Sequence, residues 1–464
     1  MVVRTFGCLK AAQRGRFFCG QPSAFTGRKL QSKRPSVLIV AANASARWGG
    51  EAILPLHIFQ GLRRAGHEAW MCVGRETKPE LDQLLGSDAH RVVYVEDTRM
   101  HSVFRWIQAR TPLWMGSNPL YFLQVIITQL RQRGTVLRVV KSLDIDVVHQ
   151  PTPVSPRVPS FLVGLPVPLV IGPMNGGMEY PQGFRFLQAR RARGVRNLAR
   201  LSAAIVARPI DAKRRADCLL VANKRTRHAL PSGVRGHVLE LVENGVIPEL
   251  WLRCDSGRVL EGRPPNRRFE LIFIGRLERW KGVDWLIEAV ARVCSSVDCG
   301  LKIVGELKDE RRRLAEKASQ LGIESRVEFL GWQPQARCAE LLSEADVLVL
   351  PSVLECGGAV VLEAMASAKA VIAVDWGGPS DYLDDSCGIL LEPGDPASLV
   401  SDLEAAITAL ASDRSRCARL GRAGREKVLA AYTWPKKIER LLKIYRLVID
   451  GMAPADHRRA VSDS

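Results

Sequence analysis

The sequence predicts an α/β protein made of two doubly wound domains, each an open parallel sheet covered by helices on both faces, that face one another across a cleft. Short apolar runs without polar alternation recur along the chain, as in strands buried on both faces of a sheet. Amphipathic segments at helical spacing separate most of these runs. With 464 residues, the chain is long enough for two such domains, each with its own core.

The first domain is expected over residues 36–240. It starts with the β-branched run 36–42, and the amphipathic segment 53–69 predicts a helix that ends near Gly66. Later strands are expected at residues 70–73, 91–95, 146–150, 168–172 and 218–222. Strands that alternate with helices in this way are typical of a parallel sheet.

The second domain is expected over residues 241–433. Its strands are predicted at residues 269–275, 300–305, 326–331, 346–352, 370–375 and 388–393. Their spacing of roughly 20–30 residues is that of repeated strand–helix–strand units. An amphipathic helix over 434–450 and a polar tail over 451–464 follow. Ligands of such sheets bind beyond the carboxyl ends of the strands, so the expected site lies between the two sheets.

The net charge of +19 is concentrated in the first half of the chain. Residues 1–250 hold 36 Lys and Arg against 16 Asp and Glu, whereas residues 251–464 hold 31 against 32. This asymmetry suggests an anionic partner, either lipid headgroups or nucleic acid, or else a solvated basic face. No recognised nucleic-acid reader module is present, and the basic residues do not interleave with a stacking platform, so we expect no nucleic acid.

The cysteines predict a cytoplasmic protein, whereas the start of the chain leaves alternatives open. Residues 1–35 contain eight basic and no acidic residues and show no apolar period, which predicts a disordered extension or a wrongly assigned start, with an organelle transit peptide as the alternative. No uncharged apolar run approaches the ~18–20 residues of a membrane-spanning helix. The 11 cysteines stand singly and form no CxxC pair or metal-ligand cluster, so reduced thiols are expected.

Two cations follow the first strand of the second domain. In FIGRLERWKG, Arg276 and Lys281 come just after the strand and before a helix. Fixed cations at a carboxyl strand end are suited to a phosphate or pyrophosphate. The alternative is an ordinary exposed loop.

Two carboxylates stand in an otherwise apolar stretch, PSVLECGGAVVLEAMASAKAVI, over residues 351–372. Gly357 and Gly358 allow close approach of the backbone to a ligand, and a helix that starts near Ala359 turns its free N–H groups toward the same place. Glu355 precedes this helix and Glu363 lies about one turn inside it. We expect the amides and cations to hold phosphate and the carboxylates to hold sugar hydroxyls. Alternatively, Glu363 pairs with a core cation and Glu355 is exposed.

A glycine turn also follows the first strand of the first domain. In SARWGGEA, Gly49 and Gly50 could bring backbone amides to the same phosphate from the opposite domain. The GxGxxG spacing of a dinucleotide fingerprint is absent.

These motifs occur in an order that resembles a known family. GRLERWKG, IVGE, LVLPSVLE, the glutamate pair, WGG and YTW are similar to the retaining glycosyltransferases of family 4, the glycosyl transferases group 1. The resemblance covers roughly residues 37–449. It implies two Rossmann-like doubly wound domains facing across a cleft, the GT-B fold, with the closing helix bracing the first domain.

The resemblance also implies roles for single residues. Arg276 and Lys281 would bind the diphosphate of a nucleotide-sugar donor, and Glu355 would contact the sugar hydroxyls near the anomeric carbon. Glu363 would hold the ribose. The base would lie against Glu306 and the turn after Gly331. The backbone would contribute further diphosphate contacts at Gly49, Gly50, Gly357, Gly358, Ala359 and Val360. The implied transfer retains the anomeric configuration and needs neither a metal nor a cofactor beyond the nucleotide-diphosphate sugar as co-substrate.

The sequence departs from the family pattern after the strand in PLVIGPMNGG. Many members carry a histidine there, whereas this chain has Pro173 and Met174. Asn175 or His149, the latter in DVVHQPTPVSP, are the acceptor-side candidates for that role, although a histidine at a strand end is more often structural. The two strings resemble a branch of bacterial enzymes that build surface or exported polysaccharides.

Two segments of the first domain predict an acceptor side. Residues 102–134 are rich in aromatic, aliphatic and basic side chains, and residues 183–216 carry ten basic residues and one acidic residue. Both suit docking on an anionic membrane surface, at the inner face of the cytoplasmic membrane, to reach a lipid-linked glycan. The alternative is that the apolar residues are core and the arginines a solvated face.

The sequence as a whole predicts a retaining, metal-independent glycosyltransferase that acts on a glycan or lipid-linked acceptor. The alternative function is a GT-B sugar-nucleotide enzyme without transferase activity, such as an epimerase or a phosphorylase. Epimerases need acid and base groups around the sugar and phosphorylases usually a cofactor lysine, and neither constellation is evident in the sequence.

Overall fold

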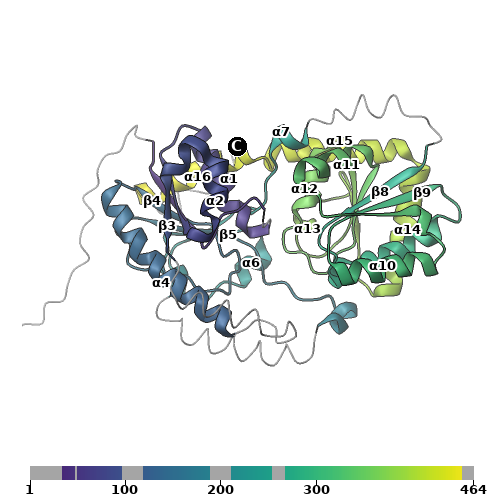
Figure 1. Cartoon of the computed structure of the whole chain (residues 1–464), viewed down its shortest axis with the longest axis horizontal. Helices are drawn as coiled ribbons and strands as arrows, with labels where there is room; N and C mark the ends of the chain where they lie inside the picture. The colour runs from purple at the N-terminus through teal and green to yellow at the C-terminus, as the bar shows by residue number, and fades with distance from the viewer. Residues whose placement is uncertain (1–33, 48–49, 97–118, 189–210, 253–266, 452–464) are drawn as a thin grey trace, which may run out of the picture. The chain divides into compact units, whose positions relative to one another are not determined.

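A computed structural model describes residues 34–47, 50–96, 119–188, 211–252 and 267–451. They contain two all-parallel sheets, which confirms the predicted fold class (Figure 1). Of the two segments considered for the acceptor side, residues 102–118 and 189–210 lie outside the described part. So do the predicted extension 1–33, Gly49 and the tail from 452 onward.

The first sheet has seven strands in the order β3-β2-β1-β4-β5-β6-β7. They are β1 Val37–Val40, β2 Ala69–Gly74, β3 Val92–Val95, β4 Val147–Gln150, β5 Leu169–Met174, β6 Cys218–Val221 and β7 His237–Glu240. The reversal of direction beside β1 is the Rossmann arrangement. The sequence missed β7, since HVLE at the edge of the sheet is only partly buried and ends on a charge.

Short helices and turns join the strands of the first sheet. The 3₁₀ turn η1 covers Gly50–Ile53 and leads into α1, Leu54–Arg64, which ends before Gly66, a glycine with φ of 76° as its predicted stop requires. The others are η2 Arg75–Thr77, α2 Lys78–Leu85, η3 Gly86–Arg91, α4 Pro119–Ser142, η5 Gln182–Leu187, η6 Ala212–Arg214, α6 Lys224–His228 and α7 Pro248–Trp251.

The second sheet repeats the same strand order over six strands, β10-β9-β8-β11-β12-β13. They are β8 Phe269–Ile274, β9 Cys299–Val304, β10 Val327–Gly331, β11 Val347–Leu350, β12 Ala370–Val374 and β13 Ile389–Leu391. All six lie where the apolar runs predict them. Their side chains are largely buried on both faces, because helices cover the sheet from both sides.

The helices of the second sheet lie on its two sides. Figure 1 shows α10 and α14 on one side and α11, α12 and α15 on the other. Their bounds, with the two 3₁₀ turns, are η7 Arg279–Lys281, α9 Val283–Val293, α10 Lys308–Gln320, η8 Glu324–Arg326, α11 Gln335–Glu344, α12 Ala359–Ala366, α13 Pro379–Tyr382, α14 Pro396–Ser412 and α15 Arg414–Ala431. The helix predicted to start near Ala359 does start there.

The last helix, α16 (Trp434–Asp450), packs on the first sheet rather than the second (Figure 1). Its Ile438, Leu441 and Tyr445 belong to the core cluster that contains Phe59 of α1. Helices α1 and α16 approach so closely that a methyl group on Gly61 would lie 2.6 Å from Ile438 Cγ1. The end of the chain thus completes the core of its beginning.

A second segment crosses in the opposite direction, and we call residues 178–187 the strap. Glu179 O accepts a hydrogen bond from Trp376 Nε1 at 2.8 Å. Phe184, which is fully buried, belongs to the core cluster of the second sheet and contacts the Trp285 ring at 4.8 Å. The strap therefore ties the first domain to the core of the second.

None of the helices in the described residues combines the length and the apolar character that crossing a membrane requires.

Candidate active site

The carboxyl ends of β8 and β11 bring Lys281 and Glu355 together. Lys281 ends the 3₁₀ turn η7 after β8, and Glu355 lies in the turn after β11. Their side chains form an ion pair between Nζ and Oε2, and each is only 14% exposed. A half-buried ion pair of this kind lies in a medium where charges interact more strongly than in water.

The same carboxylate occupies the start of α12. Glu355 Oε1 accepts a hydrogen bond from Gly358 N at 3.2 Å. Gly358 precedes the first turn with φ of 58° and ψ of 48°, a left-handed conformation that favours glycine. Lys281 and a backbone amide at a helix N-terminus therefore converge on one anionic group. A phosphate needs the same two partners.

Glu363 lies one turn inside α12 and has no hydrogen-bond or ion-pair partner for its carboxylate among the described residues. Burial raises the pKa of this carboxyl group to about 7. Among the described residues no cation pairs with Glu363, which argues against the alternative of a core ion pair. A partly buried carboxyl group without a partner is well suited to bind hydroxyl groups of a ligand.

Glu306 and Gly331, the residues expected near the base, lie side by side. A methyl group on Gly331 would lie 3.2 Å from Glu306 Oε2, and Gly331 has φ of 68°. Glu306 also lies 3.8 Å from Arg311 Nη1.

Arg276 lies outside the Lys281–Glu355 pair, although it was expected to bind the same diphosphate. Its side chain is 76% exposed and lies 3.6 Å from Glu278, not in the Lys281–Glu355 pair. Gly50 opens η1 with free space around its Cα, and it has no described contact with the second domain.

A polar network that the sequence did not predict surrounds the turn before α12. Asn175 Nδ2 donates to Glu243 Oε1 at 2.7 Å and to the carbonyl of Cys356 at 2.8 Å. Asn244 Nδ2 donates to the same carboxylate at 3.2 Å and to Tyr382 Oη at 3.3 Å. Asn175 thus lies against the predicted donor turn.

Glu243 is the centre of this network. It is 6% exposed, burial raises the pKa of its carboxyl group, and its Oε2 has no hydrogen-bond partner among the described residues. A side chain on Gly357 would overlap Glu243 Oε1 and Asn244 Nδ2, so the glycine is a steric requirement. The sequence carries one indication, an acidic residue before an Asn-Gly pair in ELVENGV.

His149 is enclosed in the core of the first domain. It has no exposed surface, Nε2 lies 2.5 Å from the carbonyl of Gly172, and Nδ1 lies 2.6 Å from Tyr445 Oη. Burial lowers the pKa of its ring to about 4. Both ring nitrogens are occupied inside the core. This geometry favours a structural role for His149 and argues against the acceptor-side role expected from the sequence.

The comparison with protein families agrees with the motifs of the second domain. Residues 261–427 match the family model described as Glycosyl transferases group 1. This part of the chain is similar to the glycosyl transferases group 1. The residues that the resemblance assigned to the donor in this domain, from Arg276 to Glu363, all lie inside the matched range, so the recognition made from the motifs is confirmed there.

Curated relatives match over the same part of the chain. An alpha-maltose-1-phosphate synthase of Mycobacterium tuberculosis is 34% identical over 229 residues, which cover 46% of this chain and 57% of the relative. A D-inositol 3-phosphate glycosyltransferase of Catenulispora acidiphila is 32% identical over 197 residues, covering 40% and 46%. The chain therefore spans about half the length of the curated relatives it matches.

Solved structures match over nearly the whole chain and show its fold. Sucrose-phosphate synthase of Thermosynechococcus elongatus has a TM-score of 0.62 at 20% identity, and covers 90% of this chain and 100% of its own. HepE of Anabaena in complex with UDP has a TM-score of 0.59 at 18% identity, covering 88% and 99%. The group 1 domain is thus the second half of a GT-B fold.

Proposed function

We propose that the protein is a retaining, metal-independent glycosyltransferase that moves a sugar from a nucleotide-diphosphate sugar to a glycan or lipid-linked glycan. One observation carries the proposal: Lys281 and the Gly358 amide converge on a single anionic group, one helical turn from the partnerless carboxyl group of Glu363. Cations and amides for phosphate beside carboxyl groups for hydroxyls are the two halves of a nucleotide-sugar site.

The donor diphosphate takes the place that the Glu355 carboxylate occupies at the start of α12. Lys281 and the amides of Gly358, Ala359 and Val360 then bind the phosphate oxygens, and the exposed side chain of Arg276 turns in to join them. Glu355, released from Lys281, accepts hydrogen bonds from the donor-sugar hydroxyls. Glu363 binds the ribose, and Glu306 and the turn after Gly331 line the pocket for the base.

The reaction exchanges one bond for another on the same face of the sugar. The bond between the anomeric carbon and the phosphate oxygen breaks, and the acceptor oxygen bonds to that carbon from the same side. The proton of the acceptor hydroxyl passes to the departing diphosphate. Lys281 and the helix terminus stabilise the charge on the leaving group, so catalysis depends on positioning and electrostatics.

The two domains divide the substrates in this proposal. Residues 36–240 bind the acceptor, 241–433 bind the donor, and 434–450 return to brace the acceptor domain. The acceptor is an intermediate of surface or exported polysaccharide synthesis, reached from the inner face of the cytoplasmic membrane. The basic character of the first half of the chain supports contact with an anionic surface.

A thermal-shift screen with UDP-, GDP- and ADP-sugars tests the donor class, and UDP comes first because HepE is solved with it. We expect one nucleotide to raise the unfolding midpoint. Glu355→Gln should lower the rate of sugar transfer about 100-fold or more while leaving the fold intact. The matched control is Glu340→Gln on α11, whose side chain is 62% exposed. Unchanged transfer in Glu355→Gln would remove that residue from the chemistry.

A further inference from the structure

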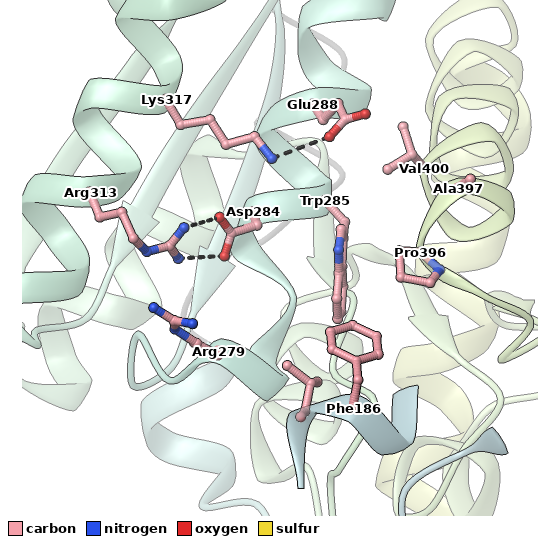
Figure 2. Close-up of a pocket in the computed structure, with 11 residues that line it drawn as sticks. Phe186, Arg279, Asp284, Trp285, Glu288, Arg313, Lys317, Pro396, Ala397 and Val400 are labelled. Carbon is pink, nitrogen blue, oxygen red and sulfur yellow. Dashed lines mark hydrogen bonds and ion pairs between the residues drawn. The ribbon is translucent and has the colours of Figure 1, made fainter. Parts of the chain in front are cut away.

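A pocket of about 440 Å³ lies between the strap and the group 1 domain, apart from the donor residues (Figure 2). The strap contributes Phe186 and Leu187, the first turn of α9 contributes Trp285, and the start of α14 contributes Pro396. The volume falls in the range of ligand sites, which occur preferentially between domains. Neither the donor-binding residues nor the polar network around Glu243 line it.

Aromatic rings form one wall of the pocket. Phe186 is 66% exposed, and in Figure 2 its ring lies beside that of Trp285. Trp285 is held from behind by the buried ring of Phe184 at 4.8 Å. An anchored indole next to an exposed phenyl ring offers flat apolar surface that a ligand could cover.

Charged side chains form the opposite wall, and they are paired with one another. Arg313 binds both carboxylate oxygens of Asp284, and Lys317 Nζ lies 3.2 Å from Glu288 Oε2. Arg279 lies 3.2 Å from Glu310. Each cation has an acidic neighbour, with Glu310 shared by Arg279 and Arg313, so the wall is rich in hydrogen-bonding groups while its charges largely cancel. Such a wall favours a neutral ligand with many hydroxyls over a phosphate or a sulfate.

The first turns of α9 and α14, which line the pocket, lie near the edge of the sheet at which the donor residues lie. Helix α9 follows β8 and α14 follows β13, and parallel strands end at a common edge. Arg279 stands two residues before Lys281, within the same turn η7. A chain-like ligand in the pocket is therefore within reach of the transfer site.

We propose that this pocket binds neutral sugar units of the acceptor glycan, some units away from the one that receives the new sugar. The apolar face of a sugar ring lies on Trp285 and Phe186, and its hydroxyls bind the paired groups of Asp284, Arg313 and Arg279. This inference rests on the proposed function for the identity of the glycan. The pocket would let the enzyme hold a growing chain while its end reacts.

Saturation-transfer NMR without any nucleotide sugar tests the pocket, with maltoheptaose, cellohexaose and mannohexaose as probes. We expect at least one oligosaccharide to bind the full chain, and Phe186→Ala to weaken that binding about tenfold. Phe186 is exposed, so its removal should leave the fold intact. Leu429→Ala on α15, which removes an apolar side chain of 39% exposure on the other side of the second sheet, is the matched control and should bind normally.

Three results would overturn the inference. One is that no probe binds, another is that Phe186→Ala binds as tightly as the unaltered chain, and the third is that a sulfated heptasaccharide or anionic vesicles displace the probe from Phe186. Because binding is measured without a donor, it is separable from transfer. If the chain transfers sugar but binds no probe, only the inference about the pocket is contradicted. If the chain binds the probe but transfers no sugar, only the proposed function is contradicted.

Discussion

The carboxyl group of Glu363 combines burial with the lack of a described partner, and both make its ionisation unfavourable. Its pKa is about 7 in the folded chain, against an ordinary value of 4.5. Between these two values the folded chain holds a proton that the unfolded chain has lost. The contribution of this group to the free energy of unfolding is therefore fully present below about pH 4.5 and is lost as the pH rises through about 7.

Replacing this carboxyl group should remove that pH dependence. We expect Glu363→Gln to be more stable than the unaltered chain at pH 8, by up to about 3 kcal/mol, and to differ little from it at pH 4.5. Urea denaturation at both pH values measures the difference. The stability of Glu340→Gln, exposed on α11, should depend on pH as that of the unaltered chain does. The same pH dependence in Glu363→Gln would contradict a raised pKa of Glu363.

The positions of several residues in the donor half could be predicted because they depend on local structure. Lys281, Glu355 and Glu363 each stand just past a strand or inside the helix that follows it, so strand order alone brings them together. Glu243 and Asn175 lie 68 residues apart, and their hydrogen bond depends on how the two domains pack. The enclosure of His149 could not be predicted for the same reason, since only the packing of α16 reveals it.

The turn before α12 packs closely against a glycine pair, Gly377 and Gly378. Gly377 has φ of 89°, and a methyl group there would overlap the carbonyl oxygen of Glu355 and lie 2.7 Å from Met178 Cε. Gly378 N donates to the same carbonyl at 2.8 Å. Any side chain at position 377 therefore shifts the backbone that carries the Glu355 carboxylate.

Comparing Gly377→Ala with Gly322→Ala distinguishes the effect of backbone strain from the effect of displacing the turn that carries Glu355. Gly322, after α10, has φ of 71° with free space around its Cα. Each substitution should cost about 1 kcal/mol of stability through its left-handed backbone, but only Gly377→Ala should also lose nucleotide binding and transfer. Denaturation and a transfer assay measure the two effects. Equal activity in both variants would show that the turn tolerates displacement.

Secondary structure was the most predictable part, because the strands of both sheets are buried on two faces and appear as apolar runs. The glycine pair marked the start of α12 to the residue, since a left-handed residue there ends any preceding extended chain. Edge strand β7 escaped prediction because its burial is partial. Short 3₁₀ turns such as η1 and η7 carry no periodicity and were not predicted.

The two domains are joined by more than the linker between their sheets. The strap places Phe184 in the second core, and α16 places Tyr445 in the first. The sequence predicted that two domains exist, but it assigned residue 184 to a basic segment of the first domain. Tertiary packing between residues far apart along the chain decides which segment enters which core. A local sequence pattern carries no information about this packing.

The contact between Tyr445 and His149 tests whether the last helix supports structure or chemistry. The Gly172 carbonyl can only accept a hydrogen bond, so Nε2 carries the proton, and Nδ1 accepts from the tyrosine hydroxyl at 2.6 Å. Tyr445→Phe keeps the ring but leaves a fully buried nitrogen without a donor. We expect a loss of about 1–3 kcal/mol in the free energy of unfolding, with an unchanged kcat for transfer.

Tyr94→Phe is the matched control, because the Tyr94 hydroxyl donates to Asp82 at 3.1 Å near the surface, where water can replace the bond. Its cost should stay within about 0.5 kcal/mol. Chemical denaturation and initial rates at saturating donor distinguish the cases. If Tyr445→Phe lost transfer at full stability, His149 would act in the reaction, and α16 would position a reacting group instead of closing a core.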